Sequence, residues 1–471
     1  MKIENTKVLL ALATLSFIPT LWLYTIGEEG IYTISSMEMW QSKNWLIQTM
    51  FGVNLQRPPL MNWLVAGVAQ VIGWSHVVIA TRFISIVASL GMVVWLYWLC
   101  IRLFQDRSFA LFAALSCLSL ADLLLYRGWL AYTDPLFSFF VFGAMASLWV
   151  ATIERHKGWL FASIVLVSCA LLTKAITAYV FYGTAVLVLL TNRQQRAFLL
   201  SPGSLLILLS VAIVPYIWLT SIPQLGGQGS SLLNEIRLKL SSIDGGEYFV
   251  RLFTYPLDTV WRLSPPVLIA LYLLLRRREL QPETSSGHFN TALIITVLTI
   301  SPYWLAPHGG IRYLLPVYPF VALICARIIW RAGESSRKLA EKWFIGIITF
   351  KFIFVLILFP YYQSHVRGEN YVTAARHITR QTDGYPVYVH DFRDVAESIV
   401  TQIDIDRLPL PTMKSPPKTW SDGFLLSSDA SEANGHLVEK IQLGGDHIYL
   451  LCRGSACQAP KSPEQATSLL K

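Results

Sequence analysis

The sequence predicts a polytopic α-helical membrane protein with a small C-terminal α/β domain. Hydrophobic residues make up 54% of the 471-residue chain and charged residues only 14%, whereas a soluble domain is about one-quarter charged. Apolar runs of about 20 residues, which can cross a hydrocarbon core about 30 Å thick, recur along most of the chain. The composition therefore excludes an ordinary soluble protein.

The net charge of +9 resides mainly in short connectors between the apolar runs. These connectors are RLFQDR (102–107), ERHK (154–157), NRQQR (192–196), RRRE (276–279) and RKLAEK (337–342). Because Lys and Arg resist translocation, the pattern predicts that the connectors lie in the cytoplasm. The sequence has no zinc-ligand spacing, RNA-binding signature or base-reading basic helix, so we expect no nucleic-acid partner.

With these connectors inside, the alternation of apolar runs predicts about eleven transmembrane helices and a cytoplasmic N-terminus. The predicted spans are 8–26, 77–101, 109–125, 135–151, 159–172, 175–190, 199–220, 266–275, 291–305, 313–329 and 343–359. The first run has no small-x-small cleavage site before Gly27, so we expect it to be retained. Two long outer loops follow at 27–75 and 221–263, and 58–73 is expected to form an interfacial helix.

From about Tyr361 the composition is that of a soluble domain, so we predict a transmembrane domain (1–360) and an outer C-terminal domain (361–471). Within the latter, the expected elements are a helix at 369–382, a strand at 386–391, a helix at 431–441 and a strand at 447–453. Such alternation predicts a small α/β domain, with a proline-rich linker at 408–417. Cys452 and Cys457 are expected either to form a disulfide in an oxidising compartment or to remain thiols.

Two adjacent carboxylates, Glu28 and Glu29, directly follow the first apolar run. In a helix, neighbouring residues point about 100° apart, so only one of the two can face a given reacting atom. Glu28 would share a helix face with Tyr32, four residues later. Either the pair performs acid–base chemistry, or the acids simply favour a helix N-terminus through the macrodipole.

Several charged residues near the predicted outer ends of the spans could bind a phosphate. Lys174 is the most informative, because a lysine at bilayer depth costs about 2.5–3.5 kcal/mol on insertion scales; the alternative is that it snorkels to the interface. Asp134 in Thr-Asp-Pro could be a helix N-cap, a site residue or both. Arg57, Arg237 and Arg312 could bind phosphate, or could only contact headgroups and solvent.

A set of short motifs occurs in a defined order along residues 8–329. It comprises E-E-x-x-Y (28–32), Q-R-P-P-L-x-x-W (56–63), T-D-P (133–135), T-K-A (173–175) and R-Y-L-L-P-x-Y-P (312–319). The ordered set resembles the GT-C membrane glycosyltransferases, especially the lipid A aminoarabinose transferases and the protein O-mannosyltransferases (glycosyltransferase family 39/83-like). The resemblance implies a GT-C-like fold. It also implies transfer of a sugar from a polyprenyl-phosphate donor to a lipid, glycan or protein acceptor, usually with inversion, on the periplasmic face of the inner membrane.

The resemblance also implies roles for individual residues. Glu28 would be the general base on the acceptor hydroxyl, supported by Glu29. Lys174 and Arg237 would bind the carrier phosphate, and Tyr32 matches the family's aromatic residue. Beside the resemblance, we expect Arg57 as a further phosphate ligand and substrate-binding or structural roles for Tyr32, Asp134, Arg312 and Tyr313. Cations can neutralise a phosphate leaving group, so no divalent cation is predicted.

Two departures from the family pattern concern the substrate rather than the reaction class. The aminoarabinose transferases carry Glu-Lys-Pro where this chain has Gln56-Arg57-Pro58, and the leading acid here is Glu28 instead of an aspartate. The alternatives from other classes are a lipid-linked sugar flippase and a non-catalytic component of an envelope glycan pathway. A flippase would place its charges around a midplane cavity, and many carriers show duplicated halves, which this sequence lacks. A non-catalytic component would tolerate Glu28→Gln.

Overall fold

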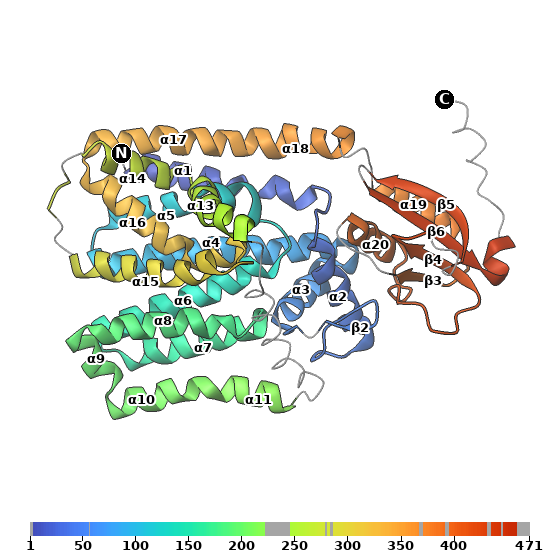
Figure 1. Ribbon diagram of the computed structural model, residues 1–471, viewed down its shortest axis with the longest axis horizontal. Coiled ribbons are helices and arrows are strands. Elements are labelled where there is room, and N and C mark those ends of the chain that lie inside the picture. Colours follow the sequence, from blue (N-terminus) through green and yellow to red (C-terminus); the bar gives the residue numbers. More distant parts are fainter. Residues whose placement is uncertain are drawn as a thin grey trace. The chain divides into compact units, whose positions relative to one another are not determined.

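The computed structural model describes residues 3–55, 57–221, 245–277, 280–282, 286–366, 371–390, 395–430, 435–443 and 446–458 (Figure 1). The chain divides into two compact units. Unit 1 comprises Met1–Thr20 and Phe83–Phe354, and unit 2 comprises Leu21–Arg82 and Val355–Lys471. The boundaries fall within η1 (Ile18–Trp22), α4 (Val77–Phe104) and η7 (Phe354–Leu358).

Unit 1 is helical throughout the part of it that the structure describes. Besides most of α4, its elements are α1 (Ile3–Leu15), α5 (Arg107–Leu118), η3 (Asp122–Arg127), α6 (Thr133–Glu154), α7 (Lys157–Thr173), α8 (Thr177–Thr191), α9 (Arg193–Leu199), α10 (Pro202–Leu209), η4 (Ser210–Ala212), α11 (Ile213–Ser221), α13 (Gly245–Arg262), α14 (Pro266–Leu275), α15 (Ser286–Leu305), η6 (Ile311–Val317), α16 (Tyr318–Arg331) and α17 (Glu334–Ile353). The predicted class, a helical membrane protein, is therefore confirmed.

Four helical segments among the described residues are long and apolar enough to cross a membrane. They are Trp74–Phe104, Thr133–Glu154, Ile311–Arg331 and Glu334–His365. Two bent pairs, Arg193–Leu199 with Pro202–Trp218 and Gly245–Arg262 with Pro266–Leu275, raise the number to 6 if each is one span. The count of eleven spans and the orientation of the termini stay predictions.

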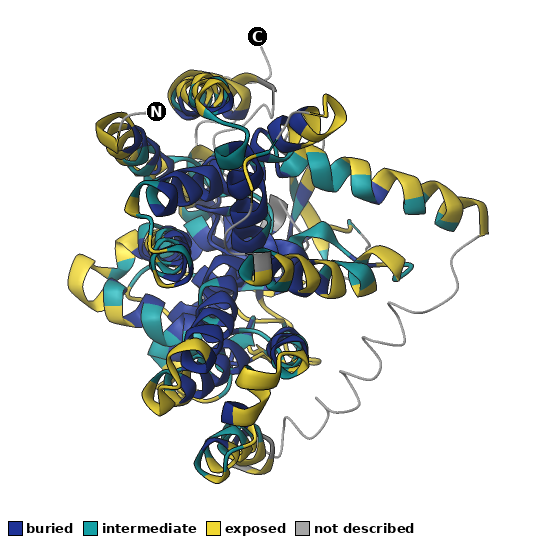
Figure 2. Ribbon diagram, turned by 90° about the vertical axis from the view of Figure 1, so that its left-hand side faces the viewer, coloured by how far each residue is buried: buried dark blue, intermediate teal, exposed yellow. Residues whose placement is uncertain are grey.

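Helix α6 is the core of unit 1. Its most apolar 18-residue window is 83% buried, against 22% for the segment Glu334–His365. In Figure 2 some helices are accordingly buried all round, whereas others carry exposed turns along their length. Small residues such as Gly143 allow the close packing: a Cβ at this glycine would lie 2.7 Å from Trp95 Nε1. Small residues at helix contacts are typical of membrane proteins, where exposed apolar faces meet lipid.

Unit 2 combines the first predicted outer loop with the C-terminal segment. Its elements are α2 (Glu29–Ser42), the β1 (Thr49–Met50)–β2 (Val53–Asn54) hairpin, α3 (Leu60–Ile72), η2 (Trp74–His76), α18 (Phe359–Tyr361), η8 (Tyr362–Val366), α19 (Tyr371–Gln381), β3 (Val387–His390), α20 (Val395–Asp406), β4 (Gly423–Ser427), β5 (His436–Leu443), β6 (Asp446–Arg453) and η10 (Gly454–Gln458). The sheet order is β3-β4-β6-β5, with β3 and β4 parallel and the other two pairs antiparallel.

Helix α2 joins the two parts of unit 2. Every residue from Glu29 to Met39 is buried, and the helix packs on α3, α20 and β1. Gly30 makes the contact with α20 possible, because a Cβ there would lie 2.8 Å from both the Glu397 carbonyl oxygen and Thr401 Oγ1. The C-terminal segment is therefore packed directly on the loop that carries the acid pair.

Most of the secondary structure predicted for the C-terminal segment is present. The structure has α19, β3 and β6 at the expected positions, and α3 where an interfacial helix was expected. The predicted helix over 431–441 is wrong, because β5 is a strand that pairs antiparallel with β6. Pairing with a neighbouring strand overrides the helix propensity of residues such as Glu439 and Lys440.

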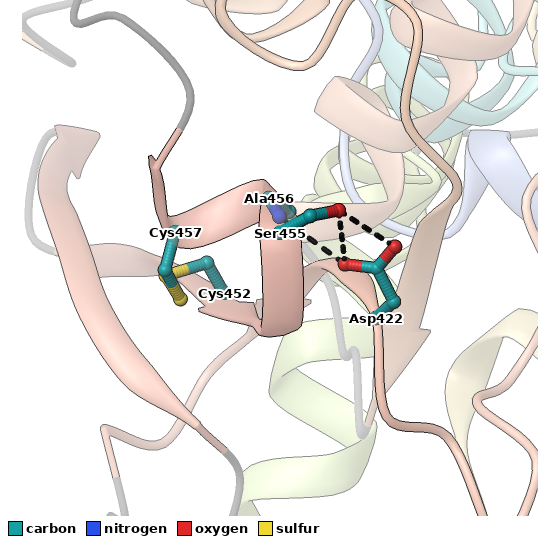
Figure 3. Close-up of a disulfide and its surroundings, with 5 residues drawn as sticks. All are labelled: Asp422, Cys452, Ser455, Ala456 and Cys457. Atoms are coloured by element: carbon teal, nitrogen blue, oxygen red, sulfur yellow. Dashed lines mark hydrogen bonds between the residues drawn. A yellow bond between two sulfur atoms is a disulfide. The ribbon is translucent and has the colours of Figure 1, made fainter.

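The last described turn of the chain is fixed by a disulfide and by one carboxylate (Figure 3). Cys452 at the end of β6 is bonded to Cys457 in η10, which decides between the two expected states of these cysteines. Ser455 Oγ donates to Asp422 Oδ1 at 2.9 Å, and the backbone N–H of Ala456 donates to the same oxygen at 3.2 Å. A stable disulfide is typical of an oxidising compartment.

Candidate active site

The acid pair lies at the start of α2. Glu28 is the N-cap residue, but its side chain makes no capping hydrogen bond, and it is half-buried. Tyr32 lies one turn further along the helix. The macrodipole explanation needs no such hydrogen bond, so both explanations of the acid pair stay open.

Glu29 is engaged in a sealed ion pair. Arg82 Nε donates to Glu29 Oε1 at 2.9 Å and Nη2 donates to Oε2 at 2.6 Å, and both side chains are fully buried. The N–H of Ile26 also donates to Glu29 Oε2, while Arg82 donates to the carbonyl oxygens of Leu23 and Tyr24. Such a bidentate, charge-assisted pair is both strong and directional. It fixes the turn that carries Glu28.

Arg57 brings a cation to the same part of unit 2. Its Nη1 donates to Tyr32 Oη at 3.2 Å, its guanidinium carbon lies 5.8 Å from the Tyr32 ring centroid, and the residue is exposed. The pKa of Arg57 is raised, first by Tyr32 and then by the negative charges of Glu28 and Glu397. Arg57 therefore lies in the electrostatic field of carboxylates from both parts of unit 2.

In unit 1, Lys174 and Asp134 form a second, more open pair. Lys174 is the C-cap residue of α7, in the short non-helical connection that precedes α8. Its Nζ donates to Asp134 Oδ1 at 2.5 Å, with the two side chains 23% and 10% exposed. The alternative expectation that Asp134 caps α6 is wrong. The helix begins one residue earlier, at Thr133, and its N-cap Tyr132 makes no side-chain cap.

Aromatic rings and a second cation complete this cluster. Lys174 Nζ lies 5.0 Å from the Tyr313 ring centroid and 6.0 Å from that of Phe137. The Arg312 guanidinium carbon lies 5.3 Å from the same Tyr313 ring, and its Nη2 donates to Tyr313 Oη at 3.4 Å. Two cations thus border the Tyr313 ring, and one of them is paired with the single carboxylate of Asp134. The cluster therefore carries a net positive charge suited to an anionic oxygen ligand.

The predicted site residues thus fall into one cluster in each unit. The cluster of unit 2 contains Glu28, Glu29, Tyr32 and Arg57; the cluster of unit 1 contains Asp134, Lys174, Arg312 and Tyr313. Arg237 lies outside the described residues. No group of three His, Cys, Asp or Glu side chains that could hold a metal ion occurs in the part of the chain that the structure describes.

Sequence reasoning missed two buried charges that organise the surroundings. One is Arg82, the partner of Glu29. The other is Asp122, which accepts a hydrogen bond from Tyr318 Oη at 2.7 Å and pairs with Arg127 and Arg262, each at 3.2 Å. Both lie in mainly apolar stretches, where an ionisable residue usually has a partner or a function. That signal was available in the sequence.

Two models of known protein families match parts of this chain. The family model for dolichyl-phosphate-mannose-protein mannosyltransferase matches residues 56–218, and that of the Alg9-like mannosyltransferase family matches residues 248–400. A search of curated proteins found no match. Both family models describe glycosyltransferases. The first match begins in the outer-loop part of unit 2 and continues into unit 1, and the second extends from α13 into α20.

Solved structures show the same fold. The structure of ArnT from Cupriavidus metallidurans bound to undecaprenyl phosphate is 12% identical, with 95% of this chain and 97% of that chain covered and a TM-score of 0.71. The apo structure of the same protein is 13% identical, with 97% and 98% covered and a TM-score of 0.69. The two family models and this shared fold together confirm the resemblance to GT-C glycosyltransferases that the motifs predicted.

Proposed function

We propose that this protein is a membrane glycosyltransferase that takes a sugar from a polyprenyl-phosphate-linked donor and transfers it to an envelope acceptor on the outer face of the inner membrane. Two mannosyltransferase family models support the reaction class. The fold shared with a protein that was crystallised with undecaprenyl phosphate supports the kind of donor. The observation that carries the proposal is the difference between the two acids. The buried ion pair of Glu29 with Arg82 fixes the helix start, and Glu28 beside it is only half-buried.

In this proposal Glu28 is the general base. It takes the proton of the acceptor hydroxyl, whose oxygen then forms a bond to the anomeric carbon of the donor sugar. The bond between that carbon and the carrier phosphate oxygen breaks, and the phosphate leaves with the electron pair. A single displacement of this kind inverts the configuration at the anomeric carbon.

The cations of the chain stabilise the leaving group. Lys174 and Arg312 neutralise the negative charge that develops on the carrier phosphate, as preorganised cations do at transferring phosphoryl groups. Arg57 and Arg237 are further candidates for this role. Before the donor binds, the charge of Lys174 is balanced by Asp134, so the phosphate competes with this carboxylate for the lysine.

The disulfide supports the proposed topology. Cys452 and Cys457 belong to the C-terminal segment, and disulfides persist in the periplasm but not in a reducing cytoplasm. The basic connectors of the helical part favour the cytoplasm. We therefore assign unit 2 to the periplasmic side, where a polyprenyl-linked sugar and an envelope acceptor meet.

The test is mass spectrometry of polyprenyl-phosphate lipids and envelope glycans in a deletion strain. The strain is complemented with wild type, Glu28→Gln or Glu247→Gln; Glu247 is an exposed acid in the first turn of α13 and serves as the matched control. We expect one polyprenyl-phosphate sugar to accumulate and one glycan sugar to disappear. Wild type and Glu247→Gln should restore both, and Glu28→Gln should restore neither at equal protein level.

The same experiment separates the alternatives. Full restoration by Glu28→Gln would reject the carboxylate as base and would favour a non-catalytic component of the pathway. For a flippase, the lipid-linked sugar would accumulate in the inner leaflet, where an impermeant periplasmic oxidant does not reach it. For a transferase it accumulates in the outer leaflet. The mass of the accumulated lipid identifies the sugar as a hexose or a pentose.

A further inference from the structure

A cavity of about 550 Å³ lies entirely within unit 2. Its walls are the last turns of α2, the β1–β2 hairpin and the segment 409–414, so both parts of the unit contribute. The polar side chains on which its chemistry depends are those of Glu38, Ser42, Asn44, Thr49, Thr412 and Lys414. Small-molecule sites typically occupy roughly 300–1,000 Å³, so the cavity has the size of a binding site.

Hydrogen bonds hold the walls of this cavity together. Gln41 Oε1 accepts from the Thr412 N–H at 2.9 Å and from its Oγ1 at 3.2 Å, and Gln41 Nε2 donates to the Leu410 carbonyl oxygen at 3.2 Å. On the other side, the Ser415 N–H donates to the Phe51 carbonyl oxygen at 3.0 Å. The C-terminal segment is thereby attached to both α2 and the hairpin, which makes the cavity a pre-formed feature of the unit.

The cavity offers hydrogen-bonding groups without net charge. The carboxylate of Glu38 is 5% exposed and accepts from Thr49 Oγ1 at 2.6 Å and from the Gly52 N–H. Lys414 is the one cation among the lining residues of this cavity, so the lining carries one acid and one base; burial raises the pKa of Glu38, and the charge of Lys414 opposes that rise. Asn44 Oδ1 accepts from the N–H groups of Leu46 and Ile47, which fixes the amide and leaves its amino group as a donor.

This chemistry selects among ligand classes. A phosphate requires an excess of cations, whereas here the lysine is balanced by Glu38. A divalent cation prefers several oxygen ligands, and the lysine beside this carboxylate opposes it. An apolar ligand would offer no acceptor to the Asn44 amino group or to the Lys414 ammonium group. A neutral polyhydroxylated ligand satisfies them, because each hydroxyl both donates and accepts.

We propose that this cavity binds a saccharide portion of the acceptor, at a distance from the hydroxyl that reacts. The inference rests on the proposed function. Glu28 precedes α2 and Glu38 lies ten residues later on it, a separation of about 15 Å along the helix axis at about 1.5 Å per residue. A rigid helix thus connects the base to the cavity. Binding energy from a remote part of a substrate orients its reacting group.

The test uses the full-length protein in detergent on a printed array of neutral oligosaccharides three to six sugars long. Ser42→Trp places a large side chain at an exposed lining position. Asn44→Asp keeps the acceptor of the local turn and removes the donor. We expect at least tenfold weaker saccharide binding for both variants. Lys418→Trp, at an exposed position outside the cavity lining, and Glu28→Gln should bind like wild type.

Each outcome decides the proposal. Absence of saccharide binding by the wild type, or binding that survives both Ser42→Trp and Asn44→Asp, would overturn it. Titrations with Ca²⁺ and inorganic phosphate are the comparison: saturable binding of either that Ser42→Trp abolishes, without saccharide binding, would also overturn it. Loss of transfer in Glu28→Gln with intact saccharide binding supports both proposals. Transfer that survives Glu28→Gln, with binding lost only in the cavity variants, rejects the base but not the cavity.

Discussion

Each of the two units contains one ion pair of the predicted site residues, and the two pairs use similar contacts in opposite ways. Arg82–Glu29 in unit 2 and Lys174–Asp134 in unit 1 have N···O distances of 2.6 and 2.5 Å. The first is fully buried and surrounded by backbone groups, whereas the second is 23% and 10% exposed and bordered by aromatic rings. A fully buried pair can hold a turn in place, but a ligand cannot contact its charged atoms. An open pair can exchange one partner for a substrate.

The same distinction separates the neighbouring glutamates. Glu29 faces Arg82, so Glu28, about 100° around the helix, cannot face the same partner. A single buried arginine therefore determines which of the two acids remains accessible for chemistry. The predictions below test whether the sealed pair is structural and whether the open pair is functional.

The largest effect is expected for Arg82→Met. It leaves the carboxylate of Glu29 buried without its cation. The Leu23 carbonyl oxygen loses its Arg82 donor, whereas that of Tyr24 keeps Gln363 Nε2 as a donor. Removing one partner of a buried ion pair typically costs about 3–5 kcal/mol of stability. We therefore expect a large drop in the Tm of the full-length protein in detergent, or failure to accumulate in the membrane.

Two variants sharpen the test of the sealed pair. Arg102→Met removes an exposed partner of Glu154 and should cost only about 0–1 kcal/mol. The double variant Glu29→Leu with Arg82→Met leaves no lone buried charge and should recover part of the loss. If Arg82→Met is no worse than Arg102→Met, the sealed pair does not hold the turn.

A smaller change in stability but a clear loss of activity is expected for Lys174→Met. This variant removes a cation from the developing phosphate charge, and loss of one such interaction typically costs about 10²–10³ in turnover. The measurement is the single-turnover rate of sugar transfer from the polyprenyl-phosphate donor, with Tm as the companion. Lys174→Arg should retain part of the rate, because it keeps the charge.

The opposite outcome would make the open pair structural as well: Lys174→Met would lower the Tm as much as Arg82→Met and leave the rate per folded molecule unchanged. In that case the assignment of the carrier phosphate to unit 1 is wrong.

The sequence predicted the parts of this molecule that depend on local pattern. Apolar length identifies the membrane helices, and the cost of a charge in an apolar run singled out Lys174. It did not identify the partner of Glu29, because Arg82 is 53 positions away and only folding brings the two together. Glu397 is even further from Arg57 along the chain. Strand β5 was missed because its pairing with β6, and not its own composition, determines its conformation.

The smallest effect concerns a buried carboxyl that forms no ion pair among the described residues. Burial raises the pKa of Asp404 to about 8, and the charge of Glu38 adds to the effect, while the Met413 N–H donates to Asp404 Oδ1 and opposes it. Between its ordinary value of 3.8 and about 8, the folded state holds a proton that the unfolded state has released. Stability must then fall as pH rises through this window, by at most about 1.4 kcal/mol per pH unit.

Asp404→Asn removes this titration while the amide oxygen can still accept from Met413. Wild type should therefore lose stability between pH 6 and pH 7, and Asp404→Asn should lose less, as measured by the Tm of the full-length protein at both values. Asp406→Asn, at an exposed position of the same helix, is the control and should behave like wild type. An equal slope for wild type and Asp404→Asn would mean that this carboxyl is charged in the folded state. Burial in unit 2 would then be tolerated without either a cation or a proton, contrary to what the Arg82–Glu29 pair suggests.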